Sequence, residues 1–370
     1  MSAAASPPAA IEGLRIGLVG PLPPPAGGMA MQTRQLADLL SGAGARVTLV
    51  QSNAPYRPAF IGRIPAVRAL ARLLPYLWAL WRAAGRSDLF HVMANSGWSW
   101  HLFAVPAIRI ARLRGVPVLV NYRGGEAAGF LARSRASVAR SMAQVARLIV
   151  PSGFLQGVFG QHGMQAEVVP NIVDLARFHP APSRPADPPH LIVARNLEPI
   201  YDNATALRAL ALVHARYPQA RLTLAGTGPE RPALEALVRE LGLGGHVQFA
   251  GRLDRDAMAA LLRSASIALN PSVVDNMPNS VLEALASGVP VVSTDVGGVP
   301  YIVQHDVDAW LVPARSPRAM ADGILALLDD PARAQRLASA GQAAVARYSW
   351  PAVAPLLLGH YRSVLEGAKR

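Results

Sequence analysis

The chain has 370 residues, which exceeds one ordinary α/β domain and is typical of two. Hydrophobic residues make up 51% and charged residues 16%, a composition that excludes a disordered or fibrous protein. The absence of cysteine excludes a disulfide framework, a thiolate metal site and a cysteine nucleophile. The Ala/Pro-rich start lacks the features of a secretory signal, and the best uncharged apolar run, Leu73 to Trp81, is too short to cross a bilayer. We therefore expect a cytoplasmic protein.

The net charge of +13 is carried almost wholly by arginine, because Lys369 is the only lysine. Residues 1–180 hold 18 arginines against 6 acidic residues, whereas residues 181–370 hold 18 basic residues against 17 acidic ones. A compositional bias of the genome would act on both halves alike. The one-sided excess therefore indicates an anionic partner for the first half of the chain.

Apolar, β-rich runs alternate with helical stretches through the first half, which predicts a parallel sheet covered on both faces. The predicted strands are Leu14–Gly20, Arg46–Ser52, Leu89–Ala94, Val116–Asn121, Leu148–Pro151 and Glu167–Pro170. A Pro-rich segment, His179–Pro189, interrupts the pattern, because neither helix nor sheet persists through it.

The same strand–helix pattern then starts again. Its predicted strands are His190–Arg195, Arg221–Gly226, Val247–Gly251, Ile267–Asn270, Val289–Ser293 and Ala309–Val312. The sequence therefore predicts an α/β protein of two Rossmann-like, doubly wound domains that face a cleft. We place the first domain at residues 1–178 and the second at 179–348, and we expect a final helix at 349–370 to pack back on the first.

Ligands of such folds bind beyond the carboxyl ends of the strands, so the loops after the strands are the candidate sites. The first strand is followed by Gly27 and Gly28 and then by a helical run, a turn that brings the backbone close to a ligand and directs free N–H groups at an anion. Neither GxGxxG nor GxxxxGK[ST] is present, which argues against a simple dinucleotide fold and a P-loop.

The second half carries a denser set of polar residues. Arg195 closes its first strand, where a guanidinium meets phosphates. Further along, a strand ends at Asn270, Asp275 occupies the loop, and Asn279 and Ser280 open a helix whose free N–H groups are suited to a diphosphate. Glu283 follows one turn later. One of the two carboxylates is suited to sugar hydroxyls and the other to a ribose.

These features together resemble family 4 of the retaining glycosyltransferases, which have the GT-B fold. The resemblance runs from Leu14 to about Tyr361. It is strongest in Val169–Phe178, which is similar to the "vpNGvD…F" segment of the family, and between Arg195 and Pro313.

The resemblance implies a role for each motif of the donor site. Gly27 and Gly28 would face the donor phosphate, and Arg195 would neutralise the diphosphate together with the helix that begins at Asn279 and Ser280. Asp275 and Glu283 occupy the two acidic places of the family's E-x7-E element, so Asp275 would touch the transferred sugar and Glu283 the ribose. The first acid is Asp instead of Glu, which leaves the identity of the sugar open.

Two further departures concern the cations of the site. The family has a lysine shortly after the equivalent of Arg195, and no lysine is found there. The family's first-domain histidine would fall near Arg123, so we expect Arg123 to take over its contact or to supply the missing cation. We predict no metal site, because Asp306-Val-Asp308 has DxD spacing but is interpreted as a turn.

The resemblance therefore implies transfer of a sugar, with retention of configuration, from a UDP- or GDP-linked donor to an acceptor hydroxyl, without a metal or other cofactor. We expect the acceptor to be lipid-linked or a precursor of a cell-surface polysaccharide. Two alternatives remain at this point: a nucleotide-sugar epimerase of the same general fold, and a non-catalytic basic protein that binds nucleic acid. The second leaves the acidic pair and the Gly-rich turns unexplained.

The segment from Arg63 to Arg86 is predicted to be helical on both sides of Pro75. If the helix is continuous, four arginines share one face and four apolar residues lie opposite. The arginines are Arg68, Arg72, Arg82 and Arg86, and the apolar residues are Leu70, Leu73, Leu77 and Trp81. This pattern indicates peripheral contact with an anionic membrane surface, against the alternative of an ordinary helix packed on the sheet.

Overall fold

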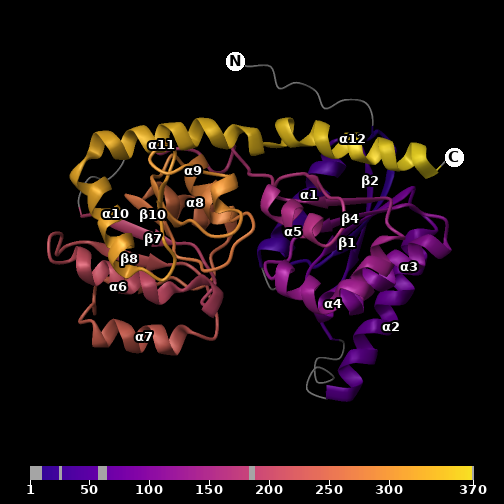
Figure 1. Ribbon diagram of the computed structural model, residues 1–370, viewed down its shortest axis with the longest axis horizontal. Coiled ribbons are helices and arrows are strands. Elements are labelled where there is room, and N and C mark those ends of the chain that lie inside the picture. The colour runs from indigo at the N-terminus through magenta and orange to yellow at the C-terminus, as the bar shows by residue number, and fades with distance from the viewer. Residues whose placement is uncertain (1–10, 25–26, 57–64, 183–187, 369–370) are drawn as a thin grey trace. The chain divides into compact units, whose positions relative to one another are not determined.

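The computed structural model describes residues 11–24, 27–56, 65–182 and 188–368, without the side chains of residues 65–70. The chain forms two compact units (Figure 1). Unit 1 contains the chain up to Ile172 together with the segment from Trp350 onward, and unit 2 is Val173–Ser349. The division lies before the Pro-rich segment, because the Val173 amide already donates to the carbonyl of Tyr348 (2.9 Å) and its side chain packs in the core of unit 2.

Unit 1 contains a six-stranded parallel sheet in the order β2-β1-β3-β4-β5-β6. Its strands are β1 (Arg15–Gly20), β2 (Arg46–Gln51), β3 (Leu89–Ala94), β4 (Val118–Tyr122), β5 (Arg147–Val150) and β6 (Glu167–Val168). Its helices are α1 (Gly28–Gly42), α2 (Pro65–Ala84), the short π-helix η3 (Trp100–Ala104), α3 (Val105–Leu113), α4 (Ala127–Met142), α5 (Gly153–Gln161) and α12 (Trp350–Ala368).

Unit 2 contains a second six-stranded parallel sheet, in the order β12-β11-β10-β7-β8-β9. Its strands are β7 (His190–Val193), β8 (Arg221–Leu224), β9 (Val247–Phe249), β10 (Ile267–Asn270), β11 (Val291–Thr294) and β12 (Trp310–Val312). Its α-helices are α6 (Asn203–Val213), α7 (Arg231–Glu240), α8 (Arg255–Arg263), α9 (Asn279–Ala286), α10 (Pro317–Asp329) and α11 (Pro331–Val345). Three short 3₁₀ helices, η4 (Pro199–Tyr201), η5 (Val299–Tyr301) and η6 (Ala346–Tyr348), complete it.

Each of the twelve predicted strands overlaps an observed strand, and the prediction of two Rossmann-like α/β units is confirmed. Side chains alternate between the two faces of each sheet, as the period of a strand requires. In β3, Leu89 and Met93 pack against α1 and α12, whereas Phe90 and Val92 pack with α2 to α5 on the opposite face. Both faces are therefore apolar, which explains the nearly continuous hydrophobic runs of the sequence.

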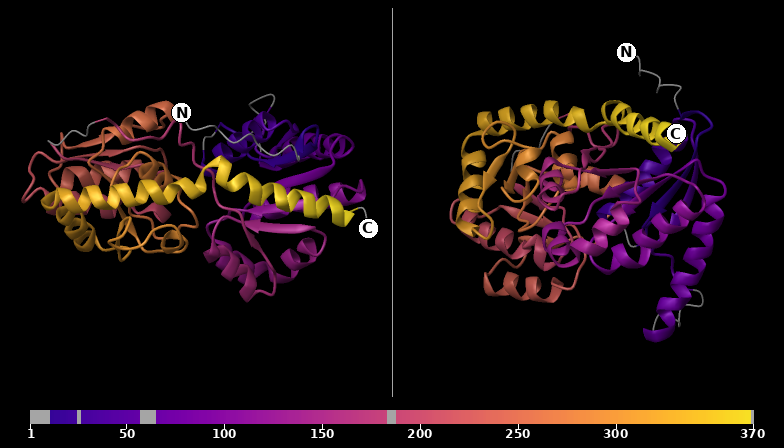
Figure 2. Two further views of the ribbon diagram at one scale, coloured as in Figure 1. Left: turned by 90° about the horizontal axis from the view of Figure 1, so that it is seen from above. Right: turned by 45° about the vertical axis from the view of Figure 1, so that its right-hand side comes forward.

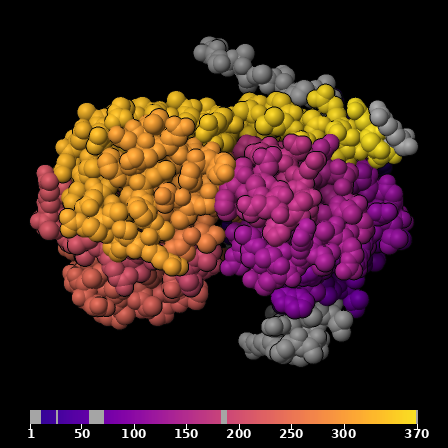
Figure 3. Space-filling model, in the orientation of Figure 1, coloured from indigo at the N-terminus to yellow at the C-terminus, as the bar shows by residue number. Residues whose placement is uncertain are grey.

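Helix α12, at the end of the chain, belongs to unit 1 although it is far from that unit's sheet in sequence. Figures 2 and 3 show it in yellow along the indigo and magenta elements of this unit. Val353, Leu357 and Leu358 pack against the sheet, and the Tyr361 hydroxyl lies 2.7 Å from Nδ1 of the buried His91 in β3. Among the described helices, none is both long and apolar enough to cross a membrane.

We predict that Leu358→Ala lowers the free energy of unfolding by about 2–5 kcal/mol, because the fully buried side chain would leave a cavity between α12 and the sheet. Leu356→Ala is the matched control, since Leu356 lies on the same helix with half of its side chain exposed and should change stability by less than about 0.5 kcal/mol. Urea denaturation measures both values. Similar losses for the two variants would contradict this packing of α12.

Candidate active site

Polar side chains of unit 2 meet where β7 and β10 end. Counted along the unit, the strand order is 3-2-1-4-5-6, and β7 and β10 are the two strands on either side of the point where the order reverses. The helices that follow strands on the two sides of such a point cover opposite faces of the sheet, which leaves room for a ligand beyond the strand ends. Arg195 follows β7. Asn270 is the last residue of β10, and Asp275 lies in the loop after it. The structure thus brings Arg195 together with Asn270 and Asp275, which are 75 and 80 positions away from it in the sequence.

The Arg195 guanidinium is held by one side chain at the end of β10 and by one in the loop that follows this strand. Its Nε donates to Oδ1 of Asn270 (2.9 Å), and its Nη2 forms a short ion pair with a carboxylate oxygen of Asp275. The ring of Tyr201 lies 4.9 Å from the guanidinium carbon. Burial lowers the pKa of Arg195 to about 10, so the side chain remains a cation at neutral pH. An arginine and a carboxylate predicted to contact the same ligand are therefore each other's partners in the ligand-free chain.

Asn270 fixes the orientation of this pair. Its Nδ2 donates to the hydroxyl of Ser293 in β11 (2.9 Å), which directs its Oδ1 toward Arg195, and the hydroxyl of Ser272 donates to the same oxygen (2.8 Å). All three polar partners are buried. Buried polar groups that are fully bonded hold a single arrangement, so Asn270 gives the guanidinium a defined direction.

Glycines let neighbouring loops pack directly on this pair. A Cβ at Gly226 would lie 2.0 Å from the carbonyl oxygen of Arg195, and a Cβ at Gly298 would lie 1.6 Å from that of Asn276. The amide of Gly298 donates to the carbonyl of Asp275 (2.9 Å). The structure gives both glycines a common reason: only glycine permits these backbone approaches.

Helix α9 begins with Asn279 and Ser280, as the sequence predicts, and Pro278 stands at its N-cap position. Within the described residues no side chain forms a cap hydrogen bond at this start, and the amides of Val281 and Leu282 donate to the carbonyl of Pro278. The positive end of the helix dipole favours an anion at this place. The hydroxyl of Ser280 is buried and lacks a hydrogen-bond partner within the described part of the chain. Glu283 follows on the next turn, within electrostatic range of Arg195 and Arg255.

Glu283 is a carboxyl group in a poorly solvated place. Burial raises its pKa to about 7, an effect that the charges of Arg255 and Arg195 only partly oppose. The free protein therefore carries a mixture of protonated and ionised Glu283 near neutral pH. A neutral carboxyl both donates and accepts hydrogen bonds, which suits it to pairs of ribose hydroxyls.

Gly27 is the N-cap residue of α1 in unit 1, and Gly28 is the first residue of that helix. A Cβ at Gly27 would meet no described atom within 4 Å, and its backbone is extended, so its neighbours do not demand a glycine. Within the described residues this helix has no side-chain cap hydrogen bond. The role of Gly27 and Gly28 at a donor phosphate stays a prediction.

Arg123 lies just after β4 in a cluster of amide side chains. Its Nε donates to Oδ1 of Asn121 (3.0 Å), and its Nη1 donates to Asn171 through a short hydrogen bond and to Oε1 of Gln32 (3.5 Å). Burial lowers its pKa to about 10, which leaves it charged. Asn171 comes from the segment in which the family resemblance is strongest, so the structure joins two motifs that the sequence treated separately.

Sequence reasoning missed His91, which orients Asn121 and, through it, Arg123. Because Oδ1 of Asn121 accepts from Arg123, its Nδ2 faces His91 and donates to Nε2 (3.0 Å). His91 must then carry its proton on Nδ1, which faces the Tyr361 hydroxyl. Burial, followed by the charge of Arg123, lowers the pKa of His91 to about 3, so it stays neutral. A polar residue at an inward position of an otherwise apolar strand was the signal available.

The DxD-spaced segment forms a turn, as interpreted from the sequence. Asp308 accepts from the amide of Gln304 (2.6 Å), and Asp306 has a positive φ of 53° and pairs with Arg333 and Arg336. Both carboxylates therefore have structural partners. In the described ranges no group of three or more His, Asp or Glu side chains is arranged to hold a metal ion.

Comparison with known proteins identifies the class to which this fold belongs. Residues 26–177 match the family described as Glycosyltransferase Family 4, and residues 188–330 match Glycosyl transferases group 1. The chain belongs to family 4 of the glycosyltransferases, a family of retaining enzymes, and has the GT-B fold.

Individual relatives show how far this similarity extends. The chain is 31% identical over 242 residues to the D-inositol 3-phosphate glycosyltransferase of Segniliparus rotundus, a match that covers 62% of the chain and about half, 54%, of that relative. It is 27% identical over 386 residues to the phosphatidyl-myo-inositol mannosyltransferase of Mycobacterium tuberculosis, which covers 96% of the chain and 99% of the relative. The structure of HepE from Anabaena, solved in complex with UDP, superposes with a TM-score of 0.75 at 18% identity and covers 95% and 100% of the two chains.

We predict that Glu283 makes the ligand-free protein less stable as the pH rises. Its folded pKa of about 7 lies above the value near 4.5 of an unfolded chain, so its stabilising contribution is complete below about pH 4.5 and is lost as the pH rises through 7. Glu283→Gln cannot ionise and should not show this loss. Between about pH 4.5 and pH 7 its free energy of unfolding should therefore rise above that of the wild type, by on the order of 1–3 kcal/mol. Glu235→Gln, on an exposed carboxylate, is the control. A difference between Glu283→Gln and wild type that does not change with pH in urea denaturation would contradict the buried carboxyl.

Proposed function

We propose that this protein transfers a sugar from a nucleoside-diphosphate donor to an acceptor hydroxyl with retention of configuration. The observation that carries the proposal is the Arg195–Asp275–Asn270 constellation at the reversal point of unit 2, beside the uncapped start of α9. Family membership favours this function over an epimerase or a nucleic-acid-binding protein. Uridine is the proposed base, since the HepE structure contains UDP.

The chemical demand of this reaction is the charge that develops on the departing diphosphate. Arg195 supplies a cation, and the start of α9 supplies the positive end of a helix dipole. Both are preorganised, so they stabilise the leaving group without reorganising during the reaction. Arg195 must exchange Asp275 for the diphosphate, which would release the Asp275 carboxylate toward the sugar. Glu283 would bind the ribose hydroxyls.

Arg123 is proposed as the cation that unit 1 contributes to the reaction. Asn121, Asn171 and Gln32 accept hydrogen bonds from its guanidinium and thereby fix its orientation. With Arg195 and Arg123 as cations, the proposed reaction requires no metal ion.

We predict that Arg195→Gln weakens UDP binding by about tenfold or more, because a charge-assisted hydrogen bond contributes roughly 1.5–3 kcal/mol. The matched control is Arg216→Gln, since Arg216 of the same unit also pairs with an aspartate but is largely exposed. Isothermal titration with UDP measures the affinity, and thermal unfolding confirms that each variant is folded.

Equal UDP affinity in both variants would reject Arg195 as the diphosphate ligand.

The metal-independent mechanism is tested by measuring sugar transfer with excess EDTA. We expect the rate to be unchanged, and loss of activity that magnesium or manganese restores would overturn the metal-independent mechanism.

The proposed acceptor is lipid-linked, and α2 is the proposed contact with an anionic membrane. The helix runs through Pro75 without interruption, but its faces differ from those expected. Leu77 is partly buried against the core and Arg72 stacks on Tyr56, so neither lies on the face that the sequence assigned to it. Arg63, Arg68 and Leu70 lie outside the described residues and side chains.

The outward face of α2 instead presents Leu74, Trp78 and Trp81, which are 63%, 61% and 47% exposed at positions i, i+4 and i+7. Arg82 stacks on Trp78 (4.6 Å) and Arg114 on Trp81 (4.7 Å). We call these five residues the α2 patch. Tryptophan with arginine at an exposed helix face is the composition of an interfacial helix. The mannosyltransferase relative, whose printed name includes a phosphatidyl lipid, supports the same proposal.

We predict that replacing Trp78 and Trp81 together by serine reduces binding to phosphatidylglycerol vesicles at least tenfold. The loss of each indole ring removes a large amphipathic surface from the membrane contact, and the arginine that stacks on the ring loses its orientation. Trp98→Ser is the control, because Trp98 is 78% exposed in the loop after β3 and not on α2. Co-sedimentation with phosphatidylglycerol and phosphatidylcholine vesicles measures binding, and equal binding of the wild type to both lipids would remove the anionic membrane from this proposal.

A further inference from the structure

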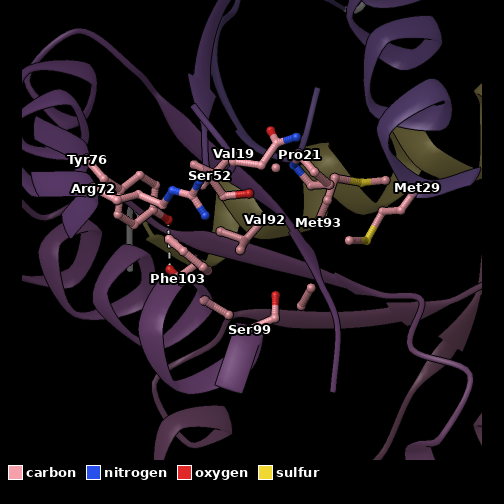
Figure 4. A pocket seen from close by; sticks show the side chains of 14 residues that line it. Val19, Pro21, Met29, Ser52, Arg72, Tyr76, Val92, Met93, Ser99 and Phe103 are labelled. Atoms are coloured by element: carbon pink, nitrogen blue, oxygen red, sulfur yellow. Dashed lines mark hydrogen bonds between the residues drawn. The ribbon is translucent and has the colours of Figure 1, made fainter. Parts of the chain in front are cut away.

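Unit 1 contains a cavity of about 120 Å³ at the carboxyl ends of β1 and β3 (Figure 4). Val19 and Gly20 of β1 and Val92 and Met93 of β3 form one wall, and α2 and η3 form others. In the sheet order β2-β1-β3-β4-β5-β6, these two strands flank the point where the order reverses. The cavity thus occupies the ligand-binding position of unit 1 that corresponds to the Arg195 position of unit 2.

Arg72 of α2 is the charged side chain in the wall of this cavity. Its guanidinium carbon lies 4.2 Å from the ring centre of Tyr56, which fixes the plane of the group. Its Nε is buried and has no hydrogen-bond partner, and no carboxylate pairs with it, within the described residues. A buried donor on a cation that lacks an acceptor is unfavourable, so an anion from outside the chain would satisfy it.

Ser52 and Ser99 also line the cavity, and two further polar side chains of the wall are bonded to the chain itself. Asn53 exchanges two hydrogen bonds with the backbone of Leu22 (2.8 Å each), and the Tyr76 hydroxyl donates to the carbonyl of Phe103 (2.7 Å). Both hold the shape of the cavity without competing for an anion. Acidic side chains are absent among the described lining residues, and much of the remaining wall is apolar. The cavity is thus suited to one oxyanion next to apolar atoms.

We propose that this cavity is an acceptor subsite that binds a phosphate group of the sugar acceptor through Arg72. This inference rests on the proposed function, since it names the chemical class of the acceptor. The volume is below the roughly 300–1,000 Å³ of sites that enclose a whole ligand, so the cavity holds one group of a larger molecule. A guanidinium presents parallel N–H groups that match phosphate oxygens, whereas the ring of Tyr56 behind it limits its movement.

One helix connects this subsite with the α2 patch. Arg72 and Tyr76, which are one helical turn apart, line the cavity. Leu74 and Trp78, also one turn apart on the same helix, are exposed. A phosphate can therefore reach Arg72 either on a soluble phosphorylated polyol or on the headgroup of a lipid. The chemistry at Arg72 is the same for both sources, and the experiment separates them.

The test uses the full chain with saturating UDP, so that the diphosphate site is filled, and titrates glycerol 3-phosphate by calorimetry. Arg72→Gln should weaken the binding of glycerol 3-phosphate by at least tenfold, since the positive charge and the parallel N–H groups of the guanidinium are both lost. Arg72→Lys, which keeps only a point charge, should give an intermediate loss. Arg109→Gln is the control, because Arg109 is exposed on α3 of the same unit, lies outside the α2 patch and should bind as the wild type does.

Vesicle binding then distinguishes the two sources of the phosphate. If Arg72→Gln loses glycerol 3-phosphate but sediments with phosphatidylglycerol vesicles as the wild type does, the acceptor is soluble. If it also loses the vesicles while Arg109→Gln retains them, the acceptor is a lipid. Binding of both probes that does not depend on Arg72, or no binding of either by the wild type, overturns the proposal.

Two controls keep the outcome separate from that of the donor site. Thermal unfolding shows whether Arg72→Gln is folded. If Arg72→Gln does not fold, Arg72→Lys, which retains the positive charge, takes its place in the titration. Stabilisation by UDP should be equal in Arg72→Gln and wild type. If UDP stabilises neither protein, the proposed function fails, and the titration of glycerol 3-phosphate, repeated in an Arg195→Gln background, still decides the role of the cavity.

Discussion

Both units depend on one topological constraint of parallel sheets. A parallel strand must be followed by a crossover to the next, and the crossover is right-handed, so the direction in which strands are added decides which face each helix covers. Where that direction reverses, the helices that follow two adjacent strands cover opposite faces of the sheet, which leaves room for a ligand beyond the strand ends. In unit 2 the residues beyond these ends are Arg195 and Asp275, and in unit 1 the same position is a cavity beside Arg72. Arg123 follows β4, the strand next to β3 in the sheet of unit 1.

Much of this arrangement could be predicted from the sequence, since strand runs, Gly-rich turns and the polar residues after strands are local signals. The strands, Arg195, Asp275 and the start of α9 were found in that way. What the sequence could not supply was the direction of side chains on α2. Its apolar and basic residues are distributed around the whole helix, so the rotation of the helix against the sheet, and not its own pattern, decides that Tyr76 is buried and Trp78 exposed.

The two arginines of the candidate sites in the sheets are oriented by different kinds of partner. Arg195 pairs with the carboxylate of Asp275. Arg123 donates to amide side chains, of which Asn121 is oriented in turn by the neutral His91 and Tyr361 of α12. Most of these partners lie far from the arginines in the sequence, so sequence reasoning could name the arginines without showing which groups hold them.

In the proposed role of Arg195 as the diphosphate ligand, its ion pair with Asp275 makes the arrival of a diphosphate an exchange of anions instead of the filling of an empty place. The affinity of the site then measures a difference between two partners of the same cation, and it is lower than the contacts of the bound state alone would give. The same carboxylate can recapture the guanidinium when the spent nucleotide departs. An enzyme built in this way gives up part of its hold on the donor and in return does not remain occupied by its product.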